Sequence, residues 1–306
     1  MKTAVILGAG GIATAVGTGL TERGYGTIHV LTRGASPAGE TLRAELKRLG
    51  VDGLDRRCDV TDWQSIASAA DDIPAPIDAL VYTPGSRSDI MRTPDELTQQ
   101  IWQQAIDLYC GGLVGAVREF RGKFAPGASV VAMSGTSGRR VVSGKHLAMG
   151  VGKAALEHSV GYLARWLGPD GVRVNGIACG AVDTPTLRGR RSPQEMQALS
   201  DAVAKTNLAG RLATAQDVAG AVILLCSDEA RWIYGQTILA DGGEELLLRL
   251  CGKAAVPPAW RTVPRTAASR SNSGDDDDRP FPASQDPAGQ GGPGSPAGRQ
   301  HPIMVR

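Results

Sequence analysis

The stretch His146-Leu-Ala-Met-Gly-Val-Gly-Lys153 has a side chain that can donate or accept a proton at each end, His146 and Lys153. Seven residues make nearly two turns of an α-helix, so we expect positions 146, 149 and 153 to share one helical face. Met149 has no proton to give, whereas histidine, with a reference pKa of ~6.5, has one. A nearby ammonium group disfavours the imidazolium, so we expect a largely neutral ring that donates an N–H to a developing oxyanion. The alternative interpretation is a histidine in a surface loop that precedes the helix.

A glycine-rich turn follows the first apolar run, TAVILG (3–8), and opens a helical stretch. The run Gly8-Ala-Gly10-Gly11-Ile12-Ala fits the pattern G-x-G-x-x-A. Absent side chains let the backbone approach a pyrophosphate, whose charge the helix N-terminus favours. The pattern therefore predicts a bound dinucleotide, with a tight turn that binds nothing as the alternative. A signal peptide would also begin with a lysine and an apolar run, but so many glycines make a poor apolar helix, and we favour a strand.

The ends of the next apolar runs indicate whether the expected dinucleotide is NAD(H) or NADP(H). The second run ends at Thr32 and Arg33, where an acidic side chain would accept bonds from a ribose and repel a 2′-phosphate. A hydroxyl and a guanidinium suit that phosphate instead, so we predict NADP(H) over NAD(H). The alternative is an arginine that is simply solvated at a strand end. Asp59 and Val60 close the third run and are expected near the adenine.

Short apolar runs alternate with longer amphipathic stretches up to about residue 250. The predicted strands are 3–8, 27–32, 54–60, 79–83, 129–134, 173–179 and 236–241. Helices between strands imply parallel pairing with right-handed crossovers, and therefore an α/β fold with one doubly wound parallel sheet between two helical layers. We predict a single domain over 1–250. Residues 251–306, rich in Pro, Gly, Ser and Asp, are predicted to be a disordered tail.

Composition narrows the classes of partner. The net charge of +2, with 21% charged residues, gives no general attraction to nucleic acid or to a membrane surface. No segment approaches the ~20 unbroken apolar residues of a membrane span. The five cysteines are scattered and never in CxxC spacing, so we expect small buried thiols in a reducing compartment and no metal site. These features predict a cytoplasmic protein that acts on a small molecule.

From about Thr3 to Leu247 the chain resembles the short-chain dehydrogenases/reductases, a family with the Rossmann fold. The resemblance is strongest in GPDGVRVNGIACGAVDTPTL (168–187) and AGRLATAQDVAGAVILLCSDEARWIYGQTILADGG (209–243). The stretch MGVGKAALEHSVGYLARWLGPDGVRVN is most similar to bacterial enoyl-acyl-carrier-protein reductases, which carry Tyr and Lys seven residues apart. The resemblance implies an oxidoreductase that forms a homodimer or homotetramer through the helix that bears Lys153 and the C-terminal strand.

The same resemblance assigns roles to further residues. Thr184 matches the hydroxyl that meets the nicotinamide carboxamide, Lys153 the ammonium that holds the nicotinamide ribose, and Gly85 the turn after the fourth strand. The family's asparagine is replaced by Asp107. Its serine falls in Met133-Ser-Gly-Thr-Ser-Gly138, where Ser134, Thr136 and Ser137 are candidates, and the enoyl-reductase spacing favours Thr136. The tyrosine is missing, since its two possible positions hold Met149 and His146.

The substituted tyrosine leaves three hypotheses about function. The first is an NADPH-dependent reductase of a carbonyl or conjugated enone, with a small, polyketide-like substrate of the kind found in secondary metabolism, and His146 or Thr136 supporting the oxygen. The second is a cyclase, dehydratase or isomerase that uses His146 and Asp107 as acid and base. The third is a non-catalytic regulator that senses NADP(H). The run Arg188-Gly-Arg-Arg191, in the segment expected to cover the substrate, either clamps an anionic group or is solvated.

Overall fold

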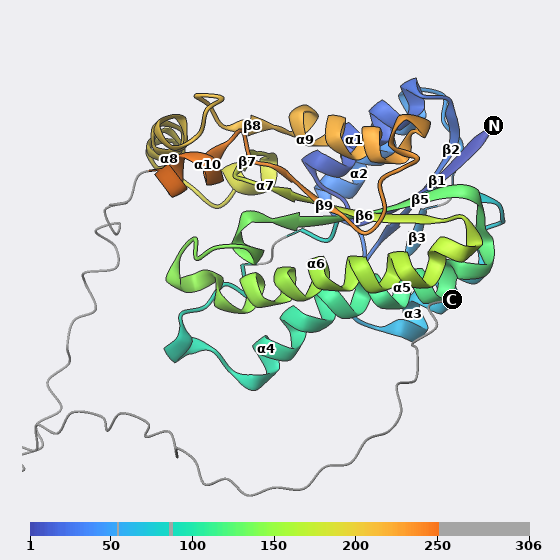
Figure 1. Ribbon diagram of the computed structural model, residues 1–306, viewed down its shortest axis with the longest axis horizontal. Coiled ribbons are helices and arrows are strands. Elements are labelled where there is room, and N and C mark those ends of the chain that lie inside the picture. Colours follow the sequence, from blue (N-terminus) through green and yellow to red (C-terminus); the bar gives the residue numbers. More distant parts are fainter. Residues whose placement is uncertain (54, 86–87, 251–306) are drawn as a thin grey trace, which may run out of the picture. The chain divides into compact units, whose positions relative to one another are not determined.

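One parallel sheet runs through the centre of the molecule (Figure 1). The computed structural model describes residues 1–53, 55–85 and 88–250. Within them, seven parallel strands lie in the order β3-β2-β1-β4-β5-β6-β9. Their bounds are Lys2–Leu7 (β1), Tyr25–Thr32 (β2), Asp55–Arg57 (β3), Ile77–Tyr82 (β4), Phe124–Gly135 (β5), Arg173–Cys179 (β6) and Thr237–Ala240 (β9). Each predicted strand is present, although the third shortens to three residues. The predicted tail lies outside the described residues, and the domain boundary at 250 stays a prediction.

Helices cover both faces of the sheet, as Figure 1 shows. One layer contains α1 (Gly11–Glu22), α2 (Pro37–Arg48) and α9 (Ala215–Cys226), and the other contains α3 (Trp63–Asp71), α4 (Gln99–Ile106), α5 (Gly112–Phe120) and α6 (Leu147–Leu167). Each layer packs on its own apolar core, one on either side of the sheet. Because both faces are covered, the central strands are apolar at successive positions. The prediction of a three-layer doubly wound fold is confirmed.

The order of the strands reverses between β1 and β4, which are neighbours in the sheet. From β1 the chain winds outward to β3, then crosses back to β4 and winds outward to β9. The Gly8 amide, just after β1, donates to the Leu31 carbonyl at 2.8 Å, and the Thr83 amide, just after β4, donates to the Leu7 carbonyl at 2.8 Å. Such a reversal leaves a crevice outside the carboxyl ends of the strands, where α/β proteins bind their ligands.

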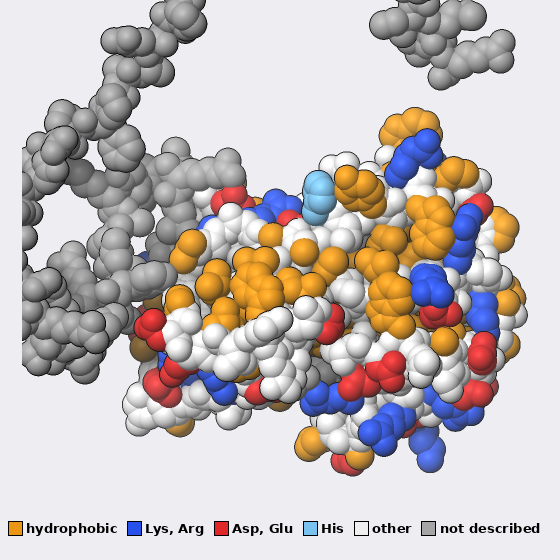
Figure 2. All heavy atoms as spheres, turned by 90° about the horizontal axis from the view of Figure 1, so that it is seen from below, with side chains coloured by type: hydrophobic (Ala, Val, Ile, Leu, Met, Phe, Trp, Pro, Cys, Tyr) orange, Lys and Arg blue, Asp and Glu red, His pale blue; other side chains and the backbone are white. Residues whose placement is uncertain are grey.

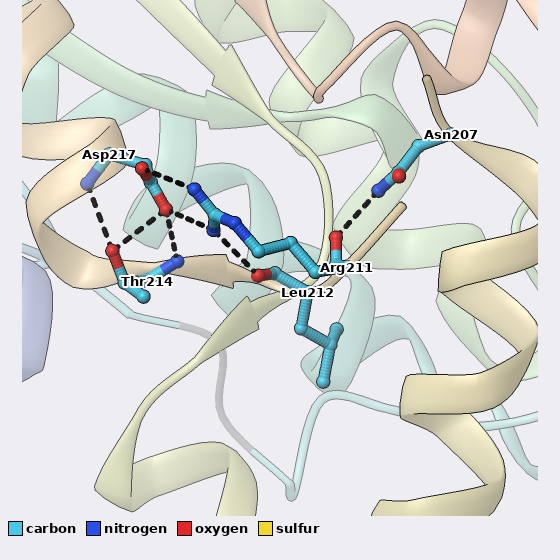
Figure 3. Close-up of polar contacts among 5 residues, drawn as sticks. All are labelled: Asn207, Arg211, Leu212, Thr214 and Asp217. Carbon is cyan, nitrogen blue, oxygen red and sulfur yellow. Dashed lines mark hydrogen bonds and ion pairs between the residues drawn. The ribbon is translucent and has the colours of Figure 1, made fainter. Parts of the chain in front are cut away.

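A segment with two helices, α7 (Pro185–Arg188) and α8 (Pro193–Thr206), follows β6. It lies between two short strands outside the central sheet, β7 (Val182–Asp183) and β8 (Ala213–Thr214). The short strands β7 and β8 pair with each other. An ion pair that caps α9 holds the returning chain: Asp217 accepts from the Arg211 guanidinium at 2.6 and 2.9 Å and from the amide and hydroxyl of Thr214 (Figure 3). The Arg211 guanidinium, followed by the two Thr214 hydrogen bonds, holds the pKa of Asp217 well below its usual range. Both ends of the segment are therefore anchored beside the crevice.

Some general predictions can be compared with the described part of the chain. Cys58 and Cys226 are buried, and Cys110 and Cys179 are half-buried, all as free thiols. Among the helices described, none is both long enough and apolar enough to cross a membrane. Within the same residues no three His, Cys, Asp or Glu side chains gather as a metal site. Cys251 lies outside the described residues. The run that follows Met1 is strand β1, which is the interpretation that we favoured over a signal peptide.

Candidate active site

The predicted glycine turn lies at the carboxyl end of β1, and the surroundings of its three glycines differ. Gly8 has a φ of +106°, and a Cβ there would lie 2.8 Å from the Thr83 carbonyl oxygen, so only glycine fits. A Cβ on Gly11 would lie 3.2 Å from Cδ of Pro185, at the start of α7. At Gly10 no described atom lies within 4 Å of the Cβ position. The space above Gly10 is therefore open for a ligand to approach the backbone.

Six of the predicted cofactor residues line one cavity of about 490 Å³: Gly8, Thr32, Arg33, Asp59, Val60 and Gly85. Gly10 and Gly11 line a neighbouring cavity between α1, α2 and α9, and Ile12 packs against the core on that side of the sheet. The Thr32 hydroxyl donates to the Gly34 carbonyl at 3.2 Å, while the Arg33 side chain is exposed. Asp59 accepts from the amide and the hydroxyl of Thr61. The cavity thus joins the turns after β1, β2, β3 and β4, and Arg190 from the α7–α8 segment also lines it.

Lys153 is buried under the carboxyl end of β5, with 7% of its surface exposed. Its Nζ donates to the Met133 carbonyl at 2.6 Å and lies 4.4 Å from the centroid of the Tyr109 ring. Burial lowers the pKa of Lys153 to about 8, and the nearby Cys179 and Glu157 act in the opposite direction. Because the group is poised near neutrality, it can hold a hydroxyl or exchange a proton.

The three hydroxyl candidates after β5 occupy different environments. Ser134 donates to Glu157 Oε1 at 2.6 Å, and Glu157 Oε2 accepts from Arg139 Nε at 2.8 Å. The Ser134 hydroxyl is therefore committed to an ion-pair network that links β5 to α6. Thr136 is buried and begins the turn that follows β5, and its carbonyl accepts from two backbone amides. Ser137 lines a different cavity, the one beside His146.

His146 lies one residue before α6, which begins at Leu147, so the prediction of a shared helical face fails at this position. Its Nδ1 lies 2.5 Å from the Ser143 hydroxyl, and the ring lines a cavity of about 430 Å³. That cavity meets α6 at Leu147, Gly150, Val151 and Ala154, whereas Lys153 is not among its lining residues. The pKa of His146 is lowered, as predicted, but by burial first and by Arg191 second. The expected influence of Lys153 on His146 is not seen.

Asp107 and Tyr109 lie on one π-helical turn, Asp107–Gly111, between α4 and α5. Asp107 accepts from the Gln103 side chain at 2.8 Å, on the exposed side of the helix. It is Tyr109, fully buried, that faces Lys153. Tyr109 was not among the predicted site residues, because the resemblance assigned the family's asparagine to Asp107. The only hint in the sequence is an aromatic residue two positions after the predicted aspartate.

Thr184 is the N-cap of α7, and its hydroxyl oxygen accepts from the Leu187 amide at 3.2 Å. Its methyl carbon would lie 3.3 Å from a Cβ on Gly11, so Thr184 borders the glycine turn. Because the oxygen is the acceptor in the cap, the Thr184 hydroxyl can still donate its hydrogen to a ligand. The structure therefore brings together the glycine turn, Thr184 and the cavity that holds Arg33, with Lys153 under β5 and His146 in a separate cavity.

Comparison with known proteins agrees with this fold. Residues 8–245 match the family described as enoyl-(acyl carrier protein) reductase. The uncharacterized oxidoreductase YmfI of Bacillus subtilis is 29% identical over 252 residues, which cover 79% of this chain and 98% of YmfI. The NADH-dependent enoyl-acyl-carrier-protein reductase FabI of Escherichia coli is 29% identical over 167 residues, 55% of this chain and 62% of FabI.

A solved structure is similar as well. The short-chain oxidoreductase from Pseudomonas aeruginosa PAO1, described as NADPH-bound and as containing an atypical catalytic center, superposes with a TM-score of 0.69 at 25% identity. The match covers 79% of this chain and 96% of that one. The chain belongs to the short-chain dehydrogenase/reductase family. It is an oxidoreductase of that family, whose members use NAD(H) or NADP(H).

Proposed function

We propose that this protein is an NADPH-dependent reductase that acts on a carbonyl or conjugated enone of a small substrate, without the family's tyrosine. The observation that carries the proposal is the cavity at the carboxyl ends of β1, β2, β3 and β4, where Arg33 and Thr32 lie and no acidic residue takes their place. The relatives are named for both cofactors, NADH for FabI and NADPH for the Pseudomonas protein. The choice of NADP(H) therefore rests on Arg33 of this chain.

The residues present fit a dinucleotide. Gly8 brings β1 and β4 so close that a side chain is excluded, Gly11 borders α7 tightly, and Gly10 faces open space. These three glycines and the start of α1 would hold the pyrophosphate, with Arg33 and Thr32 at the 2′-phosphate and Asp59, Val60 and Gly85 at the adenosine. Thr184 would donate its hydroxyl to the carboxamide. When bound, the reduced nicotinamide supplies a hydride.

The protein's part in the reaction is to support the oxygen that gains charge. Lys153, with a pKa of about 8, would hold the ribose hydroxyls and favour negative charge nearby. Thr136 and a neutral His146 are the proposed donors to that oxygen. The lowered pKa of His146 leaves its ring uncharged near neutrality, so it would donate an N–H to the oxygen of a substrate that extends into the separate cavity beside it. An acid–base pair of His146 and Asp107, as a non-redox reaction would need, gains no support, because Asp107 bonds to Gln103 on the exposed side of α4.

The proposal is tested by the affinities of Arg33→Ala for NADPH and NADH, measured by calorimetry. Losing a charge-assisted bond to the 2′-phosphate should weaken NADPH binding by roughly 10- to 100-fold and leave NADH binding unchanged. Arg231→Ala, an exposed arginine that does not line the cavity, is the matched control. Equal losses for both dinucleotides would contradict the assignment of Arg33. Consumption of NADPH with a panel of ketones and enones tests the reaction, and conversion of a substrate without net cofactor consumption would favour a non-redox enzyme.

We also propose a homodimer or homotetramer that pairs through α6, the helix that bears Lys153, together with the loop before it and the C-terminal strand β9. Large apolar side chains are exposed on α6 and the loop before it: Val141, Val142, Leu147, Val151, Tyr162 and Trp166. Figure 2 shows hydrophobic side chains gathered over this side of the molecule. Exposed apolar area of this extent is typical of a protein interface. The mass of the protein in solution, compared between wild type and Val151→Lys, tests the assignment; an unchanged oligomer in the variant would contradict it.

A further inference from the structure

The ammonium group of Lys153 is packed against an aromatic ring. The centroid of the Tyr109 ring lies 4.4 Å from Lys153 Nζ, and both side chains are buried. The same Nζ donates to the Met133 carbonyl at 2.6 Å. A cation over the face of a desolvated ring is attracted by the ring's negative electron density. The ring therefore contacts the one residue that matches the family's active site outright.

Tyr109 reaches Lys153 because the helix is interrupted at this point. The Tyr82 hydroxyl, at the end of β4, donates to the Leu108 carbonyl at 2.6 Å, and this carbonyl lies within the π-turn Asp107–Gly111. A side chain that takes a helical carbonyl as its partner opens the turn. The extra residue of the π-turn directs Tyr109 toward α6.

Gly152 of α6 allows the two helices to approach closely. A Cβ at this position would lie 2.9 Å from Cδ2 of Tyr109 and 3.0 Å from the Ala105 carbonyl oxygen. The missing side chain of Gly152 thus lets the Tyr109 ring approach the backbone of the residue that precedes Lys153. Because the ring is fully buried, it has little freedom to swing away.

We propose that Tyr109 is a positioning residue, whose aromatic face keeps the Lys153 ammonium protonated and directed at the carboxyl end of β5. The inference rests on the proposed function only in that Lys153 acts in the reaction. Tyr109 itself is fully buried and works through Lys153. The ring provides in a dry site the stabilisation that water provides for an exposed lysine.

Several other groups face the same ammonium and have to be weighed. Burial opposes the charged lysine and is the largest influence, whereas Glu157, one turn further along α6, favours it; Cys179, which ends β6, also lies nearby. Glu157 is shared with Ser134 and Arg139, and the pKa of Cys179 is itself raised by burial, so its thiol stays neutral. The contribution of the ring adds to that of Glu157. Weakening the ring should therefore lower the pKa of Lys153 and leave a smaller charged fraction at neutral pH.

The experiment compares two rings of nearly the same shape at position 109. Tyr109→Phe keeps the negative ring face, whereas pentafluorophenylalanine, incorporated at the same position, reverses its polarity. The pKa of Lys153 is measured by NMR titration of isotope-labelled lysine without any cofactor. The chain has seven lysines, and Lys153→Met assigns the signal. Pentafluorophenylalanine at Phe120, a fully buried ring of α5, is the matched control.

We expect the Phe variant to keep the wild-type pKa of Lys153 and the fluorinated variant to lower it by roughly 0.5 to 1.5 pH units. The control at position 120 should leave it unchanged. Equal pKa values in the two Tyr109 variants, or an equal drop in the control, would overturn the proposal. Because the titration needs no turnover, failure of the proposed reductase activity would leave this pattern intact, and the two ideas fail separately. If the reductase is confirmed, its pH profile should shift with the NMR value.

Discussion

Replacing Lys153 by methionine should stabilise the protein near neutral pH while removing the proposed activity. The ammonium group is 7% exposed, and burial lowers its pKa from 10.5 to about 8. A folded protein that holds a charged lysine in such a site is less stable than it would be with an apolar chain of similar length. Methionine has nearly the same length, and its sulfur suits the aromatic surface of Tyr109.

The size of the effect follows from proton linkage. Each pH unit between the folded and unfolded pKa corresponds to about 1.36 kcal/mol, so the difference between about 8 and 10.5 costs the wild type about 3 kcal/mol near neutrality. Between these two values the unfolded chain binds more protons than the folded one, so the free energy of unfolding rises with pH. From about pH 7 to about pH 9.5 the wild type should gain about 2 kcal/mol relative to Lys153→Met. The lost hydrogen bond to Met133 and any change in packing cancel in this comparison, because they do not depend on pH.

The assay is urea unfolding of both proteins at the two pH values, with a reductant to protect the thiols. Lys205 is an exposed lysine of α8, and Lys205→Met is the control. Its free energy of unfolding should change between the two pH values as that of the wild type does. A stability difference between wild type and Lys153→Met that stays constant with pH would refute the reasoning. That result would mean that Lys153 is not desolvated in the folded protein.

Further predictions concern the turn, the helix and the histidine. Gly8→Ala should cost more than ~1 kcal/mol of stability, because Gly8 has a φ of +106° and its Cβ would meet the Thr83 carbonyl. Gly10→Ala should leave the unfolding curve unchanged, since its Cβ meets nothing within 4 Å. The same variant should weaken dinucleotide binding at least ~10-fold, and unchanged binding would contradict the proposal that the glycine turn holds the pyrophosphate. Tyr82→Phe leaves the Leu108 carbonyl without its 2.6 Å donor and should lower the free energy of unfolding in urea by about 1–3 kcal/mol. An unchanged free energy of unfolding would show that this hydrogen bond does not stabilise the π-turn. Turnover in the wild type should change with His146 ionisation only below pH ~6.5, because its pKa is lowered from 6.5, and His146→Phe should remove that limb and slow turnover; an undiminished rate would exclude His146 as a donor.

The general architecture could be predicted from the sequence because it follows from local patterns. Apolar runs of strand length separated by helices leave few topologies once crossovers are right-handed. The glycine turn could be located for the same reason, since Gly8 directly follows the first strand. Arg33 and Asp59 then share a cavity because the ends of neighbouring parallel strands meet at one edge of the sheet.

The details around Lys153 could not be predicted, because they depend on contacts between distant residues. The π-turn arises where Tyr82 meets Leu108, which lies 26 residues further along the chain. The resemblance assigned the family's asparagine to Asp107, and Tyr109, two residues further along the π-turn, was missed. His146 shows a different weakness, because helical spacing holds only inside a helix and α6 begins one residue after it. Helix boundaries are the least certain feature of a sequence-based prediction.

The most direct test of the account is calorimetric titration of the full chain with NADPH and, separately, with NADH. We predict that NADPH binds at one site for each chain, more tightly than NADH, and that Gly10→Ala greatly weakens both. Absence of binding heat for either dinucleotide would contradict the central claim that the crevice beside Lys153 holds a reduced nicotinamide.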